Sequence, residues 1–125
     1  MKPPKPSPGL IRWSGPTTLA CVTQAATEAR QMFPNLRVEL IQANHQNKRD
    51  VGVNTAREWF DRREVDAIVD VNNSAVGLAV SSVAREKNKT FLASGASTAA
   101  LTGAQCSLNM AQWTYDSYMH SRSTS

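Results

Sequence analysis

Apolar residues recur at helical spacing in three separate blocks of this chain. From Pro16 to residue 33 they fall at three- and four-residue steps, which indicates one helix with a single buried face. Pro34 follows directly and ends that helix, because proline cannot continue it. Two further stripes of the same kind lie at residues 53–60 and 76–84. The pattern therefore predicts three amphipathic helices.

The starts of the second and third helices carry capping residues. Asp50 is expected to be the N-cap of the second helix, and Asn73 or Ser74 that of the third. Short side chains with an oxygen acceptor satisfy the N–H groups that a helix start leaves unpaired.

Short β-rich runs separate the helical blocks and predict strands. The expected strands cover residues 9–13, 36–41, 65–71, 89–93 and 110–114, with a turn or short helix at 98–104. Alternation of strands and helices predicts an α/β fold, a doubly wound parallel sheet flanked by helices, with right-handed crossovers. We expect one domain over residues 9–118, with disordered tails at 1–8 and 119–125.

Composition narrows the class of protein further. A chain of 125 residues can bury one core, and no stretch approaches the roughly 18 apolar residues of a membrane helix. The net charge is +4, but the cations are scattered and no aromatic residues are interleaved with them. Nucleic-acid binding is therefore not expected.

Cysteine usage and motifs predict neither a metal site nor a cofactor. Cys21 and Cys106 stand far apart, with no Cys/His ligand spacing. A disulfide between them stays open, and two buried thiols are the favoured interpretation. Neither glycine-rich phosphate-binding motif occurs.

Small polar residues follow three of the expected strands, at Ser14-Gly15, at 72–74 and at 94–98. In parallel sheets, ligands bind beyond the carboxyl ends of the strands, where helix N-termini attract carboxylates. The hydroxyls of Ser74, Ser97 and Thr98 can add hydrogen bonds. The pattern predicts a ligand site as readily as a set of ordinary caps and turns, and both alternatives remain open.

Catalytic chemistry has less support. No glycine falls two residues after Ser97, so the nucleophile-elbow motif is missing, and an enzyme using Ser94 or Ser97 is disfavoured. His45 and His120 are expected to be ordinary surface histidines. Acidic residues such as Asp70 are expected to be solvated, capping or ion-paired.

The three tryptophans differ in position. Trp59 lies on the second helix stripe and is expected in the core. Trp13 and Trp113 lie near strand ends, where they and Ser14 can flank a ligand, although core packing is favoured for both tryptophans.

Four long phrases resemble one protein family. "VELIQANHQNKRDVG", "VDAIVDVNNSAVGLAV", "VAREKNKTFLASGAST" and "LTGAQCSLNMAQWTYDSY" together run over residues 38–118. They are similar to the amino-terminal lobe of bacterial solute-binding proteins of the leucine-binding family. More narrowly, they resemble the branch that serves ABC importers of branched-chain amino acids, amides, urea and aromatic acids.

This resemblance implies a periplasmic, two-lobed, non-enzymatic binder that needs no cofactor and docks on ABC permease subunits. The solute would lie between lobes that close about a hinge. The contribution of this lobe would come from Asn73 and Ser74 in one loop and from Ala96, Ser97 and Thr98 in another.

The chain also departs from the family. Family members are usually more than twice as long, no export signal is visible, and Asn72 stands where a proline is common. One lobe supplies one wall, so we expect binding no tighter than about millimolar and some self-association through the exposed cleft or a sheet edge. The alternatives are a cytoplasmic interaction module and a non-functional remnant derived from such a lobe.

Overall fold

Parallel pairing of short strands builds the sheet at the centre of this computed structural model. The structure describes residues 10–12 and 16–124. The strands are β1 (Leu10–Arg12), β2 (Ile41–Gln42), β3 (Ala67–Val69), β4 (Thr90–Ala93) and β5 (Met110–Gln112). Their order is β2-β1-β3-β4-β5, and every pairing is parallel.

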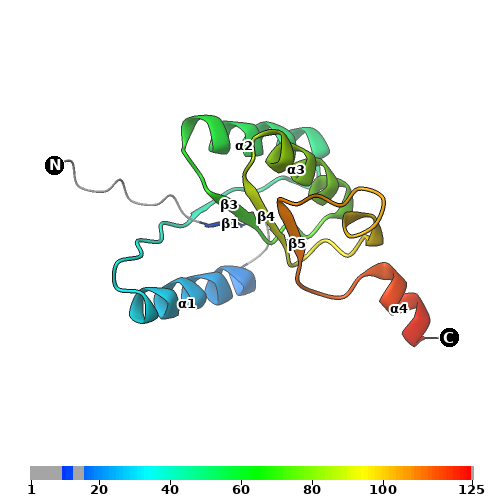
Figure 1. Cartoon of the computed structure of the whole chain (residues 1–125), viewed down its shortest axis with the longest axis horizontal. Coiled ribbons are helices and arrows are strands. Elements are labelled where there is room, and N and C mark those ends of the chain that lie inside the picture. Colours follow the sequence, from blue (N-terminus) through cyan, green and yellow to red (C-terminus); the bar gives the residue numbers. More distant parts are fainter. Residues whose placement is uncertain (1–9, 13–15, 125) are drawn as a thin grey trace.

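Helices connect the strands and cover both faces of the sheet. They are α1 (Pro16–Met32), α2 (Arg49–Arg62), α3 (Ser74–Glu86), the 3₁₀ helix η1 (Ala99–Leu101) and α4 (Ser117–Ser123). α2 and α3 lie together on one face, and α1 lies on the opposite face (Figure 1). The predicted doubly wound parallel sheet is thereby confirmed. Within the described residues, no helix combines the length and the apolarity that crossing a membrane requires.

The strand order changes direction beside β1. The chain moves outward from β1 to β2, returns past β1 to β3, and then continues through β4 to β5. The carboxyl ends of β1 and β3 therefore flank the topological switch point, the place where open α/β sheets hold their ligands.

The main core lies between the sheet and the α2–α3 layer. Phe91 of β4 and Ile68 of β3 are fully buried, and they share one apolar cluster with Val76 and Val80 of α3. Trp59 of α2 belongs to the same cluster, as its stripe predicts. The second and third helix stripes thus bury the predicted faces.

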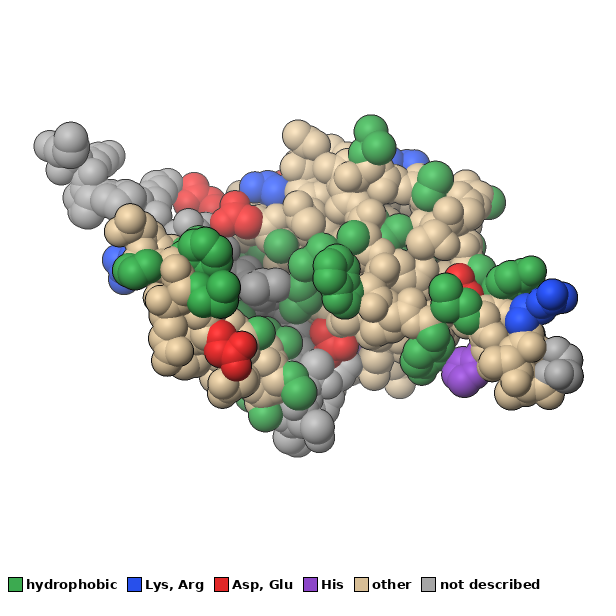
Figure 2. All heavy atoms as spheres, turned by 60° about the horizontal axis from the view of Figure 1, so that its bottom comes forward, with side chains coloured by type: hydrophobic (Ala, Val, Ile, Leu, Met, Phe, Trp, Pro, Cys, Tyr) green, Lys and Arg blue, Asp and Glu red, His purple; other side chains and the backbone are tan. Residues whose placement is uncertain are grey.

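The face that carries α1 is covered less completely. Ala26 is buried, but Met32 is 72% and Phe33 58% exposed, and Leu19 and Ala25 are exposed as well, so the predicted burial of these four residues is wrong. Figure 1 shows the carboxyl-terminal part of α1 lying beyond the edge of the sheet, and Figure 2 shows hydrophobic side chains on its surface. The apolar stripe exists, but no described element covers its last turn.

Several boundaries differ from the sequence analysis. α2 begins at Arg49 with Lys48 as its N-cap, so the predicted Asp50 cap is wrong. Only Ile41 of the expected strand 36–41 is in β2, because β2 lies at the sheet edge and pairs with just two residues of β1. At the other end, α4 occupies much of the segment expected to be a disordered tail. Its N-cap Asp116 accepts a hydrogen bond from the backbone N–H of Met119 at 2.7 Å, which explains the helix start.

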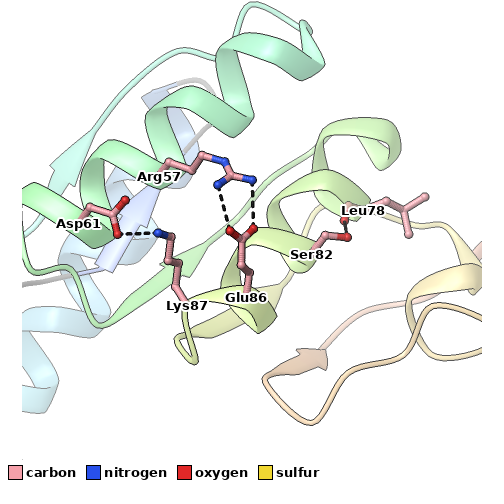
Figure 3. Close-up of polar contacts among 6 residues, drawn as sticks. All are labelled: Arg57, Asp61, Leu78, Ser82, Glu86 and Lys87. Atoms are coloured by element: carbon pink, nitrogen blue, oxygen red, sulfur yellow. Dashed lines mark hydrogen bonds and ion pairs between the residues drawn. The ribbon is translucent and has the colours of Figure 1, made fainter.

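Ion pairs join α2 to α3 on the solvent side of their contact. The Arg57 guanidinium meets both carboxylate oxygens of Glu86, at 3.1 and 3.0 Å, and Lys87 lies 3.0 Å from Asp61 (Figure 3). Because these side chains are partly exposed to solvent, each pair contributes at most about 1 kcal/mol to stability. The core cluster, rather than the ion pairs, holds this layer in place.

Replacing Phe91 by alanine tests that conclusion. We expect F91A to lower the free energy of unfolding by about 3–5 kcal/mol, because it empties the centre of the cluster. Urea denaturation followed by circular dichroism measures the change. L108A is the control, since Leu108 is fully exposed and its removal should leave stability nearly unchanged. Equal effects of the two variants would contradict the assignment of the core.

Candidate ligand-binding site

The loops that follow β3 and β4 lie against each other at the carboxyl edge of the sheet. Val69 pairs with Leu92, so the residues after these strands emerge side by side. Gly95 is so close to the other loop that an added Cβ would lie 2.9 Å from the Cα of Asn72. A Cβ on Gly77 of α3 would likewise lie 2.8 Å from the Cβ of Ala96. The structure thus brings the predicted Asn73-Ser74 and Ala96–Thr98 groups together.

The first group forms the start of α3. Asn73 is the N-cap, and its Oδ1 accepts a hydrogen bond from the backbone N–H of Val76 at 3.0 Å. The next N–H, of Gly77, is taken by the Asn73 carbonyl at 2.7 Å. The first N–H groups of a helix have no intrahelical acceptor, so those of Ser74 and Ala75 remain for an anion. Ser74 is half-buried, and its hydroxyl has no hydrogen-bond partner among the described residues.

The second group is partly committed to structure. Thr98 is the N-cap of η1, its hydroxyl accepting from the backbone N–H of Ala100 at 3.3 Å. Ala96 is fully buried, and its carbonyl accepts from Nε2 of Gln112 at 3.1 Å. Ser97 is half-buried, and no described residue bonds its hydroxyl. The two hydroxyls left for a ligand are therefore those of Ser74 and Ser97.

His45 is buried beside this site, which corrects the expectation of a surface histidine. It is 2% exposed and lies in the loop between β2 and α2. The backbone N–H of Asn47 donates to Nδ1 at 3.0 Å, so Nε2 carries the proton and donates to Oδ1 of Asn72 at 3.2 Å. Burial lowers the pKa of His45, although the bond to Asn72 opposes that shift. His45 thus holds the residue that precedes the α3 cap.

Asp70 also departs from expectation, because it is neither solvated nor ion-paired. It lies at the end of β3, is 7% exposed and has a left-handed φ of 59°. The Ser94 hydroxyl donates to its Oδ1 at 3.3 Å, whereas Oδ2 has no hydrogen-bond partner among the described residues. Burial of a polar group and a left-handed non-glycine residue both cost free energy, so this strand end is a strained point next to the switch point.

Aromatic residues border the second loop. Trp113 follows β5 at the same edge of the sheet and is 81% exposed, so core packing is wrong for it, while its predicted place beside a ligand remains untested. The backbone N–H of Ser117 donates to the Ser97 carbonyl at 2.7 Å, which places the exposed Tyr115 and Tyr118 near that loop. Trp13 and Ser14 lie outside the described residues.

The remaining candidates are ordinary surface groups. Cys21 and Cys106 are exposed and free, so the favoured interpretation of two buried thiols is wrong. His120 is exposed, as expected. No three His, Cys, Asp or Glu side chains of the described residues gather closely enough to hold a metal ion.

A family model described as "periplasmic binding protein" matches residues 6–125. The chain belongs to the periplasmic binding protein family. The resemblance stated from the sequence phrases is thereby confirmed. No curated protein sequence matches this periplasmic binding protein significantly.

Solved structures with the same fold come from several bacteria. One is a branched-chain amino acid ABC transporter ligand-binding protein from Burkholderia xenovorans, 30% identical, with a TM-score of 0.79; 88% of this chain aligns with 32% of that one. Another is an ABC transporter substrate-binding protein from Desulfitobacterium hafniense in complex with Leu, with 13% identity and a TM-score of 0.83. Here 94% of this chain aligns with 37% of that one. A third is a solute-binding protein from Rhodopseudomonas palustris in complex with benzoate, with 15% identity and a TM-score of 0.72. In this case 89% of this chain aligns with 33% of that one. This periplasmic binding protein chain thus spans about a third of the length of these structures.

The pKa of His45 predicts a pH dependence of stability. Because burial lowers its pKa from 6.5 in the folded state, folding favours the neutral ring. This contribution is complete above the unfolded pKa of 6.5 and is lost as the pH falls toward the lowered folded value. We expect urea unfolding of the native chain to require less denaturant at about pH 5.5 than at about pH 7.5. The variant H45Q should reduce this difference and H120Q should retain it; a full difference in H45Q would contradict the argument.

The contact between the two loops predicts the effect of a single methyl group. G95A would place its Cβ against the backbone of Asn72, which cannot rotate away as a side chain can. We expect a loss of about 1–3 kcal/mol in the free energy of unfolding, measured by urea denaturation. The control is A104G, a change of the same size at an exposed loop position. Unchanged stability in G95A would mean that the loops lie further apart.

Proposed function

We propose that this chain supplies one wall of a solute-binding site in an ABC importer of amino acids, amides or aromatic acids. The observation that carries the proposal is the junction of the α3 N-terminus with the loop after β4, immediately beside the switch point of the sheet. The lobe binds solute and catalyses no reaction, in keeping with family relatives that are solute-binding proteins.

The chemistry at this junction suits a carboxylate. The N–H groups of Ser74 and Ala75 lie in the first turn of α3, where the helix dipole favours negative charge. The hydroxyls of Ser74 and Ser97 lie on the two loops that meet there and can donate to carboxylate oxygens. Leucine and benzoate, the ligands named for two structural relatives, share a carboxylate and differ in the rest of the molecule. This lobe would therefore recognise the shared group.

The rest of the solute needs a second wall. Small-molecule sites bury about 70–90% of the ligand surface, whereas one sheet edge with two loops covers a single side. The chain spans about a third of its structural relatives, whose remaining length would include a second lobe. We propose that the complete site forms between two lobes in the periplasm and delivers solute to ABC permease subunits.

A role as an interaction module is the second candidate, favoured by the exposed large apolar residues. Trp113, Tyr115, Tyr118 and Met119 follow one another near the carboxyl-terminal end and are each more than half exposed. A surface of this kind also favours self-association. Concentration-dependent sedimentation, with or without solute, separates an association surface from a ligand-flanking one.

Titration of the ¹⁵N-labelled chain with leucine and with benzoate tests the proposed site. We expect saturable shifts of the amides at residues 74, 75, 97 and 98, with Kd of about 1 mM or weaker because one wall is present. S74A should weaken binding by about two- to tenfold, the value of one hydrogen bond. The matched control is S82A, an exposed serine on the same helix.

Two results would contradict the proposal in different ways. Micromolar affinity would mean that a single wall suffices, which would overturn the half-site argument. If none of the four amides shifts, even with solute in large excess, the proposed location of the site is wrong.

A further inference from the structure

A hollow lies beside the second half of α3, on the flank that does not contact α2. Ser81, Ser82 and Arg85 form one wall, and the loop with Ala104, Gln105 and Ser107, between η1 and β5, forms the other. Its volume is about 180 Å³. Figure 3 shows Ser82 pointing away from α2, whereas Glu86 and Lys87 point toward it. The hollow is thus separate from the candidate solute site at the α3 N-terminus.

Hydrogen-bond donors face the hollow from both walls. Ser81 is 4% exposed, yet its hydroxyl has no hydrogen-bond partner among the described residues. Ser107 Oγ accepts from the backbone N–H of Asn109 at 3.1 Å, so its own proton is free to be donated. The Gln105 side-chain amide adds N–H donors on the same wall. The Ser82 hydroxyl already donates to the Leu78 carbonyl at 3.2 Å, so it is the least available donor for a ligand in the hollow.

The charge around the hollow is positive. Arg85 has no ion-pair partner among the described residues, and no carboxylate is among the lining side chains. The nearest acid along α3, Glu86, is neutralised by Arg57 on the other flank. The negative end of the helix dipole opposes an anion here, but it amounts to about half a charge and acts along the axis, whereas Arg85 carries a full charge at the side. The balance favours an anion.

We propose that this hollow binds a tetrahedral oxyanion, phosphate or sulfate, with Arg85 as its main charged ligand and Ser81, Gln105 and Ser107 as neutral donors. A tetrahedral anion presents acceptor oxygens in all directions, and so suits donors on two facing walls. A carboxylate presents both oxygens on one side and offers fewer acceptors to such an arrangement. The volume equals that of about six water molecules, which is enough for one such ion.

A bound oxyanion would join α3 to the loop that leads into β5. Because the ion would bind the folded chain and not the unfolded one, it would raise the unfolding temperature with its concentration. This consequence is independent of solute binding, since no lining residue belongs to the candidate solute site.

Titration with sodium phosphate, at constant ionic strength maintained with sodium chloride, tests the proposal by ¹⁵N NMR. We expect saturable shifts of the amides at residues 81, 85, 105 and 107, and a similar response to sulfate. R85Q should weaken binding by about tenfold or more, through loss of a charge-assisted hydrogen bond. S81A, which keeps the arginine, should weaken it less. The control R62Q removes an arginine from the last turn of α2 and should bind as the native chain does.

Three outcomes would overturn the proposal. The first is a linear response without saturation, which indicates general ionic screening. The second is equal weakening by R85Q and R62Q, which would assign the effect to net charge. The third is acetate binding as tightly as phosphate, which would remove the argument for a tetrahedral ion.

Discussion

Burial of α3 against β3 and β4 is the packing constraint on which the candidate site depends. Val76 and Val80 of the helix and Ile68 and Phe91 of the strands have no exposed surface and share one cluster. Side chains packed at this density leave the helix little freedom to slide. The start of α3 is therefore fixed relative to the strand ends, and the loop at Gly95 closes against it. A site built from backbone N–H groups needs this rigidity, because those groups cannot adjust by rotating a side chain.

Local sequence signals predict this part of the molecule well. Helix periodicity identifies the buried faces of α2 and α3, and the Asn73 cap is confirmed by its bond to Val76. The same signal fails for Met32, the last residue of α1, and for Phe33, which follows it. Periodicity reports which face of a helix is apolar, but burial depends on what lies opposite, and no described element lies opposite these residues. The adjacency of the two loops follows from the pairing of β3 with β4, which the alternating pattern of strands and helices does not by itself determine.

His45 and Asp70 show what local signals cannot provide. A histidine in a polar loop has the composition of a surface residue, yet β1 lies between β2 and β3 and the loop folds back to reach Asn72. Asp70 has a left-handed backbone at a strand end, for which its sequence neighbours give no indication. Both residues depend on contacts between segments far apart in the chain. The stability of a buried polar group depends on its hydrogen-bond partners, because an unsatisfied buried group costs more free energy than a satisfied one contributes.

The same rigidity bears on how a solute would be held. A preformed wall requires no ordering on binding, so little of the interaction free energy is spent on arranging this side of the site. Under the proposed function, its N–H groups and hydroxyls would recognise a carboxylate that many solutes share, and they would contact little of the remaining molecule. Discrimination among amino acids, amides and aromatic acids must then come from groups that face the rest of the solute. We propose Trp113 and Tyr115 for that role, since both are exposed near the Ser97 loop and neither packs in the core.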